Sequence, residues 1–408
     1  MSARQAVILV GGKGTRLGDL ARTTPKPLLP IDGDTVFLDE VLFNVARHGY
    51  DDIVLMAGHL GEQFVDRYDS RRLRGARVSV IVEPEPAGTG GALRHLGERL
   101  APEFLFLNGD TIFDINLRGL DPVLAQSDRA LAALALRRVP DPARYGSVRL
   151  EDERIVAFHE KSAALSGAAG CINAGVGLFR REILDYVERL PCSIEMDVHP
   201  RLASDGRLIG REFAGYFIDI GLPDTLRQAR DELPKRRARP TVFFDRDGVL
   251  NHDVGYTHKT KDLRWIDGAV ETVRRVNDLG ALAIVVSNQA GVARGYYGTA
   301  DVDAYHAAMQ QELARHGAHI DAFCVSPHHP EATLDEWRHP DPPDRKPNPG
   351  MILRAMADWP VDKANSLLIG DKESDLQAAR RAGIDGLLFA GGNLAEFADV
   401  ALSRLVRE

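Results

Sequence analysis

Short apolar runs alternate with longer amphipathic stretches along the first half of the chain. The apolar runs are AVILV (6–10), IVLM (53–56), VSVIV (78–82) and FLFL (104–107), and one amphipathic stretch covers 35–48. Apolar runs of this length, rich in β-branched residues and separated by helical patterns, are typical of βαβ units whose strands are buried on both faces. The pattern therefore predicts an α/β fold built on a largely parallel sheet.

This pattern is interrupted once and then starts again. The segment LPKRRARP (233–240) carries two prolines, four basic residues and almost no apolar side chains, as linkers between domains often do. After it come four further apolar runs: TVFF (241–244), ALAIVV (281–286), AFCV (322–325) and SLLIG (366–370). We therefore predict two α/β domains, 1–233 and 241–408, joined by a basic linker at 234–240.

Composition narrows the class of protein. The chain has 408 residues, of which 44% are hydrophobic and 27% charged, and this fits a folded globular protein. Its net charge of −8 argues against a nucleic-acid surface, and no apolar run approaches the roughly 20 residues that span a bilayer. Its three separated cysteines suggest neither disulfides nor a cysteine zinc cluster. We expect a cytoplasmic protein with small-molecule substrates and no nucleic-acid or membrane partner, and a homo-oligomer is left open.

A glycine-rich segment follows the first apolar run. It reads GGKGTRL (11–17) and is followed by TPKPLLP (24–30). Glycines let backbone N–H groups approach phosphate oxygens, and Lys13, Arg16 and Lys26 can neutralise a triphosphate. The segment fits neither the Walker pattern nor the dinucleotide GxGxxG pattern, and taken alone it equally fits an ordinary strand-to-helix turn.

The combination of these two segments is more specific and resembles the sugar-1-phosphate nucleotidyltransferases. Further segments continue the resemblance over some 230 residues: EPEPAGTGGAL (83–93), FLNGD (106–110), FHEKS (158–162), NAGVGLF (173–179) and FIDIGLPDTL (217–226). The resemblance implies a Rossmann-like mixed sheet and in-line attack of a sugar phosphate on the α-phosphorus of a nucleoside triphosphate, with pyrophosphate leaving.

The resemblance also assigns residues. Arg16 and Lys26 would be catalytic, with Lys26 on the sugar phosphate, and Glu160 and Asn173 would bind sugar hydroxyls. The positions that would bind the nucleotide are Gly11, Gly12, Gly14, Thr15, Arg16, Gly88, Gly91 and Asp110. Asp110 and Asp219 match the family's metal-binding aspartates, and carboxylates are the ligands that Mg²⁺ prefers.

The second domain opens with paired aspartates after an apolar run. The motif is FFDRDGVLN (243–251), and a lone DxD of this kind is often only a solvated turn. Three more segments follow in order: SNQAG (287–291), RKPNPG (345–350) and GDKESD (370–375). The set resembles the haloacid-dehalogenase superfamily of phosphatases, in its capless branch with a Rossmannoid fold.

In that superfamily's scheme, Asp245 attacks phosphorus, and Asp247 protonates the leaving oxygen and later deprotonates water. Lys346 would neutralise charge on the nucleophile and the phosphate. The residues that would contact the substrate are Ser287, Asn288 and Arg345. The residues that would bind Mg²⁺ are Asp245, Asp247 and Asp371, with Asp375 nearby.

That branch contains the heptose-bisphosphate phosphatases and the histidinol-phosphate phosphatases. The chain resembles the heptose enzymes more closely, in the segments SNQAGVARGYY (287–297) and PHHP (327–330). Those enzymes usually carry a zinc ion on a cysteine-containing loop. Here Ser326, Pro342 and Asp344 stand at the cysteine positions, and only His328 matches. Structural zinc needs about four ligands, so we predict Mg²⁺ in both domains and no zinc. The alternative is that Cys324 and His339 replace the missing zinc ligands, although their spacing does not follow the family pattern.

The two domains suggest successive reactions. A heptose 1,7-bisphosphate that loses its 7-phosphate becomes the heptose 1-phosphate that a nucleotidyltransferase converts to an activated sugar. Because VLMAGHLGEQ (54–63) resembles heptose-phosphate guanylyltransferases, GTP is the favoured donor, and GDP-heptose with pyrophosphate the expected products. One alternative is another hexose 1-phosphate with ATP, UTP or dTTP, fused to a phosphatase of a different sugar phosphate or of histidinol phosphate. Another is that one half is inactive and regulatory.

Overall fold

The computed structural model describes residues 3–142, 147–159 and 169–405. The chain divides into two compact units, Met1–Lys235 and Arg236–Glu408, with the boundary inside the basic segment 233–240. Helix α6 (Pro223–Arg236) runs into that segment, and β15 (Thr241–Phe244) starts the second unit. No helix among the described residues combines the length and apolar character needed to cross a membrane.

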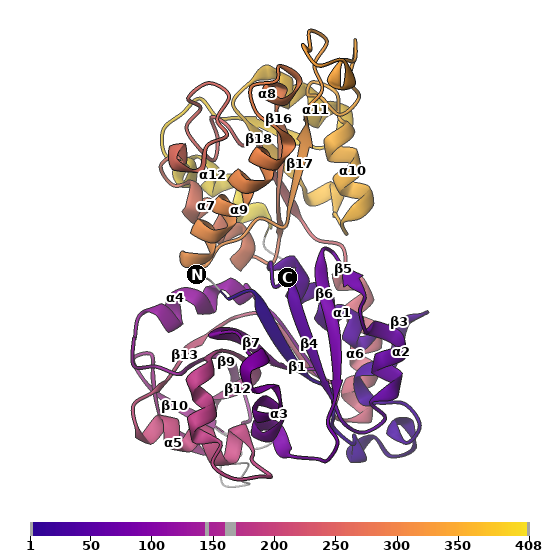
Figure 1. Ribbon diagram of the computed structural model, residues 1–408, viewed down its shortest axis with the longest axis vertical. Helices are drawn as coiled ribbons and strands as arrows, with labels where there is room; N and C mark the ends of the chain where they lie inside the picture. Colours follow the sequence, from indigo (N-terminus) through magenta and orange to yellow (C-terminus); the bar gives the residue numbers. More distant parts are fainter. Residues whose placement is uncertain (1–2, 143–146, 160–168, 406–408) are drawn as a thin grey trace. The chain divides into compact units, whose positions relative to one another are not determined.

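The first unit is built on a mixed sheet (Figure 1). Within the described residues its strand order is β10-β11-β13-β9-β12-β7-β1-β4-β6-β5. The strands β1 (Gln5–Leu9), β4 (Asp52–Ala57), β6 (Ala76–Val82) and β7 (Glu103–Asn108) are parallel, as the apolar runs predict. The strand β12 (Gly170–Arg180) is antiparallel to both β7 and β9 (Ala132–Val139), and this makes the sheet mixed.

The remaining strands of this unit are β2 (Pro30–Asp32), β3 (Thr35–Val36), β5 (Arg72–Leu73), β8 (Thr111–Asp114), β10 (Ser147–Glu151), β11 (Arg154–His159), β13 (Leu208–Glu212) and β14 (Tyr216–Asp219). Its other α-helices are α1 (Phe37–Arg47), α2 (Glu62–Tyr68), α3 (Gly88–Leu96), α4 (Leu120–Ala125) and α5 (His199–Ser204). Successive residues of a strand point to opposite faces. Thus Ile8 packs in one core with Leu42 of α1, and Val7 packs in the other with Leu93 of α3.

The second unit has an entirely parallel sheet with the order β17-β16-β15-β18-β19 among its described residues. Its other strands are β16 (Leu282–Asn288), β17 (Ala322–Ser326), β18 (Leu367–Gly370) and β19 (Asp385–Leu388). Its α-helices are α7 (Ala269–Asp278), α8 (Ala290–Ala293), α9 (Thr299–Arg315), α10 (Gly350–Asp358), α11 (Glu373–Ala382) and α12 (Leu394–Leu402). Phe244 and Phe243 of the central strand lie in separate cores on the two faces.

This topology places the second unit's motifs side by side. The strand β15 lies between β16 and β18, and all three run in the same direction. Their carboxyl ends therefore meet at one edge, where the residues after β15, at the end of β16 and after β18 carry the chemistry.

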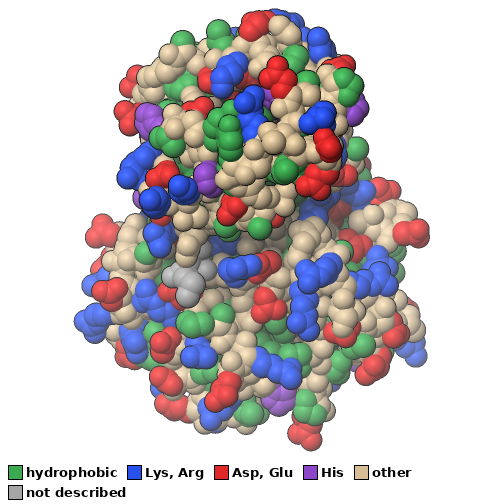
Figure 2. Space-filling view, turned by 45° about the horizontal axis from the view of Figure 1, so that its top comes forward, with side chains coloured by type: hydrophobic (Ala, Val, Ile, Leu, Met, Phe, Trp, Pro, Cys, Tyr) green, Lys and Arg blue, Asp and Glu red, His purple; other side chains and the backbone are tan. Residues whose placement is uncertain are grey.

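On the face seen in Figure 2, acidic and basic side chains are interspersed and do not gather into one basic surface.

Candidate active sites

The first unit brings Asp110 and Asp219 together through a two-stranded pairing. The strands β8 and β14 are antiparallel, with Thr111 opposite Asp219. The Thr111 hydroxyl donates to Asp110 Oδ1 at 3.2 Å and lies 3.5 Å from Asp219 Oδ2. The backbone N–H of Gly221 donates to Asp219 Oδ1 at 2.6 Å, which fixes that carboxylate. Two hard oxygen ligands thus lie side by side although 109 positions separate them in the sequence.

Two basic side chains lie beside these carboxylates. Lys26, whose side chain is 8% exposed, forms an ion pair with Asp110. An ideal Cβ on Gly221 would lie 3.2 Å from the Arg16 guanidinium and 2.6 Å from Asp219, so this position has no room for a side chain. Burial raises the pKa of Asp219, Asp110 raises it further, and Lys26 and Arg16 oppose the shift. Adjacent, half-buried carboxylates of this kind fit a divalent cation.

The glycines of the 11–17 segment are there for different reasons. Gly11 packs against the chain after β4, since an ideal Cβ there would lie 2.9 Å from the nitrogen of Gly58. Gly14 has a φ of 61°, in the left-handed region that favours glycine. Gly12 has no atom within 4 Å of an ideal Cβ, and Thr15 is exposed at the start of a 3-10 helix. Among these residues, Gly12 and Thr15 are the ones left open to a ligand.

At Gly88 and Gly91 the structure gives a packing reason for glycine. An ideal Cβ on Gly88 would lie 2.4 Å from the carbonyl oxygen of Cys192, and one on Gly91 would lie 3.0 Å from a methyl group of Leu190. The space beside both glycines is thus filled by the chain's own 190–192 segment and not by open solvent. The neighbouring Thr89 hydroxyl donates to Glu195 at 2.8 Å, a contact that sequence reasoning did not anticipate.

Asn173 lies where β12 bulges away from β9. Its Oδ1 accepts a hydrogen bond from the Gly175 nitrogen at 3.1 Å. Gly175 has a φ of 73°, and an ideal Cβ there would lie 2.7 Å from the side-chain nitrogen of Asn108, which ends β7 two positions before Asp110. The bulge therefore brings Asn173 to the same end of the sheet as Asp110. Glu160, the other predicted sugar ligand, lies outside the described residues.

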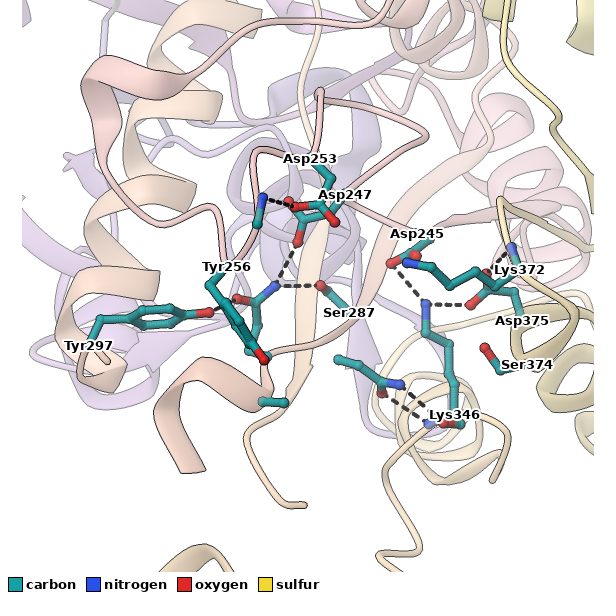
Figure 3. Close-up of a pocket in the computed structure, with 14 residues that line it drawn as sticks. Asp245, Asp247, Asp253, Tyr256, Ser287, Tyr297, Lys346, Lys372, Ser374 and Asp375 are labelled. Carbon is teal, nitrogen blue, oxygen red and sulfur yellow. Dashed lines mark hydrogen bonds and ion pairs between the residues drawn. The ribbon is translucent and has the colours of Figure 1, made fainter. Parts of the chain in front are cut away.

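In the second unit a cavity of about 240 Å³ opens at the carboxyl ends of the central strands (Figure 3). Five residues predicted from the motifs line it: Asp245, Asp247, Ser287, Asn288 and Lys346. Side chains to which the sequence assigned no role also line it, among them Asp253, Tyr256, Gln289, Tyr297 and Lys372, and so does Asp375, which was expected near the metal ligands. Arg345, predicted as a substrate contact, is not part of the lining and donates instead to the carbonyl oxygen of His328 at 3.3 Å.

Lys346 is the buried cation of this cavity. Its Nζ lies 2.8 Å from Asp245 Oδ1 and 2.7 Å from Asp375 Oδ1, and its side chain is only 2% exposed. Burial lowers the pKa of Lys346, but the attraction of the two carboxylates outweighs it and the pKa is raised. The lysine therefore remains charged and fixes the orientation of Asp245.

Three carboxylates of the second unit are close enough to share one ion. Asp245, Asp371 and Asp375 each place an oxygen within 4.8 Å of the others. Burial, and then the charge of Asp245, raise the pKa of Asp371 to about 6. Asp371 Oδ1 is buried and has no hydrogen-bond partner among the described residues. A hard cation would satisfy this oxygen and offset the repulsion, so the donor set fits Mg²⁺.

Asp247 does not belong to that group, although the motif predicted it as a metal ligand. Its Oδ2 accepts hydrogen bonds from Arg246 at 2.8 Å and from Gln289 at 3.0 Å. Its Oδ1 accepts from Arg246 at 3.1 Å and from Asn251 at 2.9 Å. Arg246 is fully buried, and neither it nor Gln289 was singled out from the sequence. The carboxylate cluster thus includes Asp375, which the sequence placed near the metal ligands, and does not include Asp247.

Each unit is similar to a known protein family. Residues 5–236 match the family described as "Nucleotidyl transferase", and residues 344–401 match the one described as "HAD-hydrolase-like". The chain belongs to the nucleotidyl transferase family and carries a HAD-like phosphatase domain. Both families generally use Mg²⁺. We therefore call the first unit the transferase domain and the second the phosphatase domain.

Three relatives are similar to parts of the chain. The D-glycero-beta-D-manno-heptose-1,7-bisphosphate 7-phosphatase of Rhodopseudomonas palustris is 43% identical over 41% of this chain and 93% of its own length. The D-glycero-alpha-D-manno-heptose 1-phosphate guanylyltransferase of Aneurinibacillus thermoaerophilus is 34% identical over 56% of this chain and 98% of its own. The mannose-1-phosphate guanylyltransferase of Mycobacterium tuberculosis is 33% identical over 61% of this chain and 70% of its own length.

Asn288 of the phosphatase domain has a role in the structure that its motif did not suggest. Its amide nitrogen donates to the carbonyl oxygen of Lys346, and its amide oxygen accepts from the Lys346 nitrogen, both at 3.0 Å. The Asn288 amide thus makes both of these hydrogen bonds to the Lys346 backbone and holds it in place. The sequence had assigned this side chain to the phosphoryl oxygens.

The loop that would carry zinc in the related phosphatases is held by other contacts. Asp344 forms an ion pair with Arg354 at 2.5 Å, and the His328 ring lies 5.3 Å from the Trp337 ring. Burial raises the pKa of the Cys324 thiol, which disfavours the thiolate that binds metal. The loop thus has a ring contact at Trp337 and an ion pair to Arg354.

Proposed function

We propose that this chain carries out two successive reactions. The phosphatase domain removes the 7-phosphate of D-glycero-D-manno-heptose 1,7-bisphosphate, and the transferase domain transfers GMP from GTP to the resulting heptose 1-phosphate. The observation that carries the proposal is that one chain joins similarity to a heptose-bisphosphate phosphatase and to a heptose 1-phosphate guanylyltransferase. Both relatives are named for phosphates of D-glycero-D-manno-heptose, the first for the β anomer and the second for the α anomer. GDP-heptose and pyrophosphate are the expected products, and the cytoplasm, which holds such substrates, is the proposed compartment.

In the transferase domain, an oxygen of the sugar phosphate attacks the α-phosphorus of GTP while the bond to pyrophosphate breaks. The proposed nucleotide contacts are the Gly11–Gly14 segment, Thr15 and Arg16, and Gly88 and Gly91 would act by shaping the neighbouring loop. Lys26 would hold the sugar phosphate, and Asn173 and Glu160 the sugar. Asp110 and Asp219 would hold Mg²⁺, which neutralises the triphosphate. Catalysis is then mainly alignment and charge neutralisation.

In the phosphatase domain, Asp245 attacks the phosphorus as its bond to the sugar oxygen breaks, and Asp247 gives its proton to that oxygen. Water then attacks the aspartyl-phosphate and passes a proton to Asp247, which releases phosphate and regenerates Asp245. Lys346 orients Asp245 at 2.8 Å, and Ser287 at the cavity wall would contact the phosphoryl oxygens. Asp245 and Asp371, with Asp375 close by, would hold Mg²⁺, which reduces the repulsion between nucleophile and phosphate.

A coupled assay tests the whole proposal. Purified protein is incubated with heptose 1,7-bisphosphate and Mg²⁺ plus GTP, ATP, UTP or dTTP in separate reactions, and phosphate, pyrophosphate and sugar nucleotide are measured. We expect phosphate release in every reaction, and pyrophosphate with a sugar nucleotide chiefly with GTP. Phosphate release without any sugar nucleotide would overturn the proposed transferase activity. If a sugar nucleotide forms from supplied heptose 1-phosphate but no phosphate is released from heptose 1,7-bisphosphate, the proposed phosphatase activity is overturned.

A second candidate keeps GTP but changes the sugar. The similarity to a mannose-1-phosphate guanylyltransferase covers 61% of this chain, more than the similarity to the heptose enzyme does. Mannose 1-phosphate would then be the acceptor. Comparing kcat/KM for mannose 1-phosphate and heptose 1-phosphate in the same assay distinguishes the two candidates.

A further inference from the structure

Gln289 connects two functional side chains of the phosphatase cavity. It follows β16 directly and is 2% exposed. Its side-chain nitrogen donates to Asp247 Oδ2 at 3.0 Å and to the Ser287 hydroxyl at 2.8 Å (Figure 3). One amide group thus connects Asp247, in the loop after β15, to Ser287 of the neighbouring strand β16. No other described side chain has hydrogen bonds to both Asp247 and Ser287.

Tyr297 fixes which way this amide points. Its hydroxyl donates to Gln289 Oε1 at 2.8 Å, so the oxygen faces the tyrosine and the nitrogen faces the two acceptors. A flipped amide would place its oxygen against the Asp247 carboxylate, which only accepts hydrogen bonds when ionised, and that bond would be lost. The Tyr297 ring is itself stacked on His258 at 4.2 Å. It occupies space that only a glycine at 291 leaves free, because an ideal Cβ there would lie 2.2 Å from the ring.

We propose that Gln289, oriented by Tyr297, is a positioning residue for the phosphatase reaction. It holds the Asp247 carboxyl group at a fixed separation from the Ser287 hydroxyl, so that one can serve the leaving oxygen while the other contacts the phosphoryl group. The inference rests on the phosphatase function proposed above. The Arg246 side chain also bonds to Asp247, but its other contacts are with the buried His306, the carbonyl oxygen of Thr257 and the Tyr305 ring. It therefore ties Asp247 to the core and not to the phosphoryl contact.

This role predicts dependence on the leaving group. A sugar alkoxide is a poor leaving group and needs the proton of Asp247 as its bond to phosphorus breaks, whereas a nitrophenolate leaves readily without one. A misplaced Asp247 should therefore slow attack on an alkyl phosphate far more than attack on an aryl phosphate. The ratio kcat/KM reports steps up to departure of the leaving group, and later hydrolysis of the aspartyl-phosphate does not enter it.

The test compares Gln289→Met with a matched control in the full chain. Methionine keeps the size of glutamine and removes its hydrogen bonds. Gln310→Met is the control, because Gln310 lies in the same domain and also makes two hydrogen bonds, to the backbone of Ile320 at 2.7 and 2.8 Å. For Gln289→Met we expect kcat/KM for heptose 1,7-bisphosphate to fall roughly 10- to 100-fold, a share of what general-acid catalysis supplies. The value for p-nitrophenyl phosphate should change by less than about threefold.

Tyr297→Phe keeps the test decisive if Gln289→Met does not fold. It retains the ring and removes only the hydroxyl that orients the amide. We expect kcat/KM for heptose 1,7-bisphosphate to fall about two- to fivefold more than kcat/KM for p-nitrophenyl phosphate. Equal losses on both esters, or the same discrimination in Gln310→Met, would overturn the positioning role. If the unmodified protein releases phosphate from neither ester, the proposed phosphatase function itself fails. The two failures are therefore distinguishable.

Discussion

The two candidate sites solve the problem of phosphate charge differently. In the phosphatase domain Lys346, Asp245 and Asp375 have side chains that are 2%, 9% and 1% exposed, so the ion pairs are buried before any substrate arrives. In the transferase domain Asp110 remains 27% exposed, and Arg16 lies on an exposed segment. A covalent nucleophile gains from a preorganised, water-poor setting. Nucleotidyl transfer has no enzyme nucleophile, and its cations can meet the triphosphate from an accessible loop.

The sharpest way to break this comparison is to remove the buried nucleophile. Asp245→Asn takes away the attacking oxygen and should lower phosphate release roughly a thousandfold or more. Nucleotidyl transfer from supplied heptose 1-phosphate should persist, because none of the transferase residues comes from the second unit. Phosphate and pyrophosphate release are measured on the same sample. Loss of both activities in a variant with unchanged circular dichroism would show that the two domains do not act independently.

The buried ion pairs should also matter for stability. Lys346→Met leaves Asp245 and Asp375 buried without their cation, and removing one partner of a buried pair costs about 3–5 kcal/mol. Arg380→Met is the control, because its pair with Glu373 has side chains that are 62% and 59% exposed, and such pairs are worth about 0–1 kcal/mol. Urea unfolding followed by circular dichroism gives both values. Similar small losses in the two variants would mean that Lys346 contributes little to the fold.

In the transferase site the carboxylates should matter through the metal. Asp110→Ala or Asp219→Ala removes a hard oxygen ligand, and we expect turnover to fall roughly a hundredfold, the scale of losing one strong electrostatic stabiliser. Pyrophosphate release with GTP measures it, and phosphate release by the same variants serves as the internal control. Near-normal turnover in either variant would remove the proposed metal role from that residue.

Particular residues show how far sequence reasoning reached. The apolar runs predicted β1, β4, β6 and β7 and, in the second sheet, β15 to β18, because strands buried on both faces have a nearly continuous apolar sequence. The more exposed strand β19 had no such run. The position of Asp219 beside Asp110 was inferable only from resemblance, since it depends on the pairing of β8 with β14 across a long separation. Motif spacing likewise fixes where Asp247 and Asn288 stand along the chain. It does not fix where their side chains point, and both turn toward partners that the motif did not suggest.

The smallest expected effect concerns zinc, whose removal should change nothing. The positions that carry cysteines in related phosphatases hold Ser326, Pro342 and Asp344, and Asp344 forms an ion pair with Arg354 of α10 at 2.5 Å. A site poor in thiolates binds zinc weakly, so both domains should depend on Mg²⁺ alone. Protein purified without added zinc should contain well below one equivalent by metal analysis, and phosphatase activity lost to EDTA should return with Mg²⁺. Stoichiometric zinc that resists dialysis, with activity that Mg²⁺ does not restore, would mean that nearby groups such as Cys324 and His339 form a replacement site. The phosphatase domain would then need a structural metal that the transferase domain lacks.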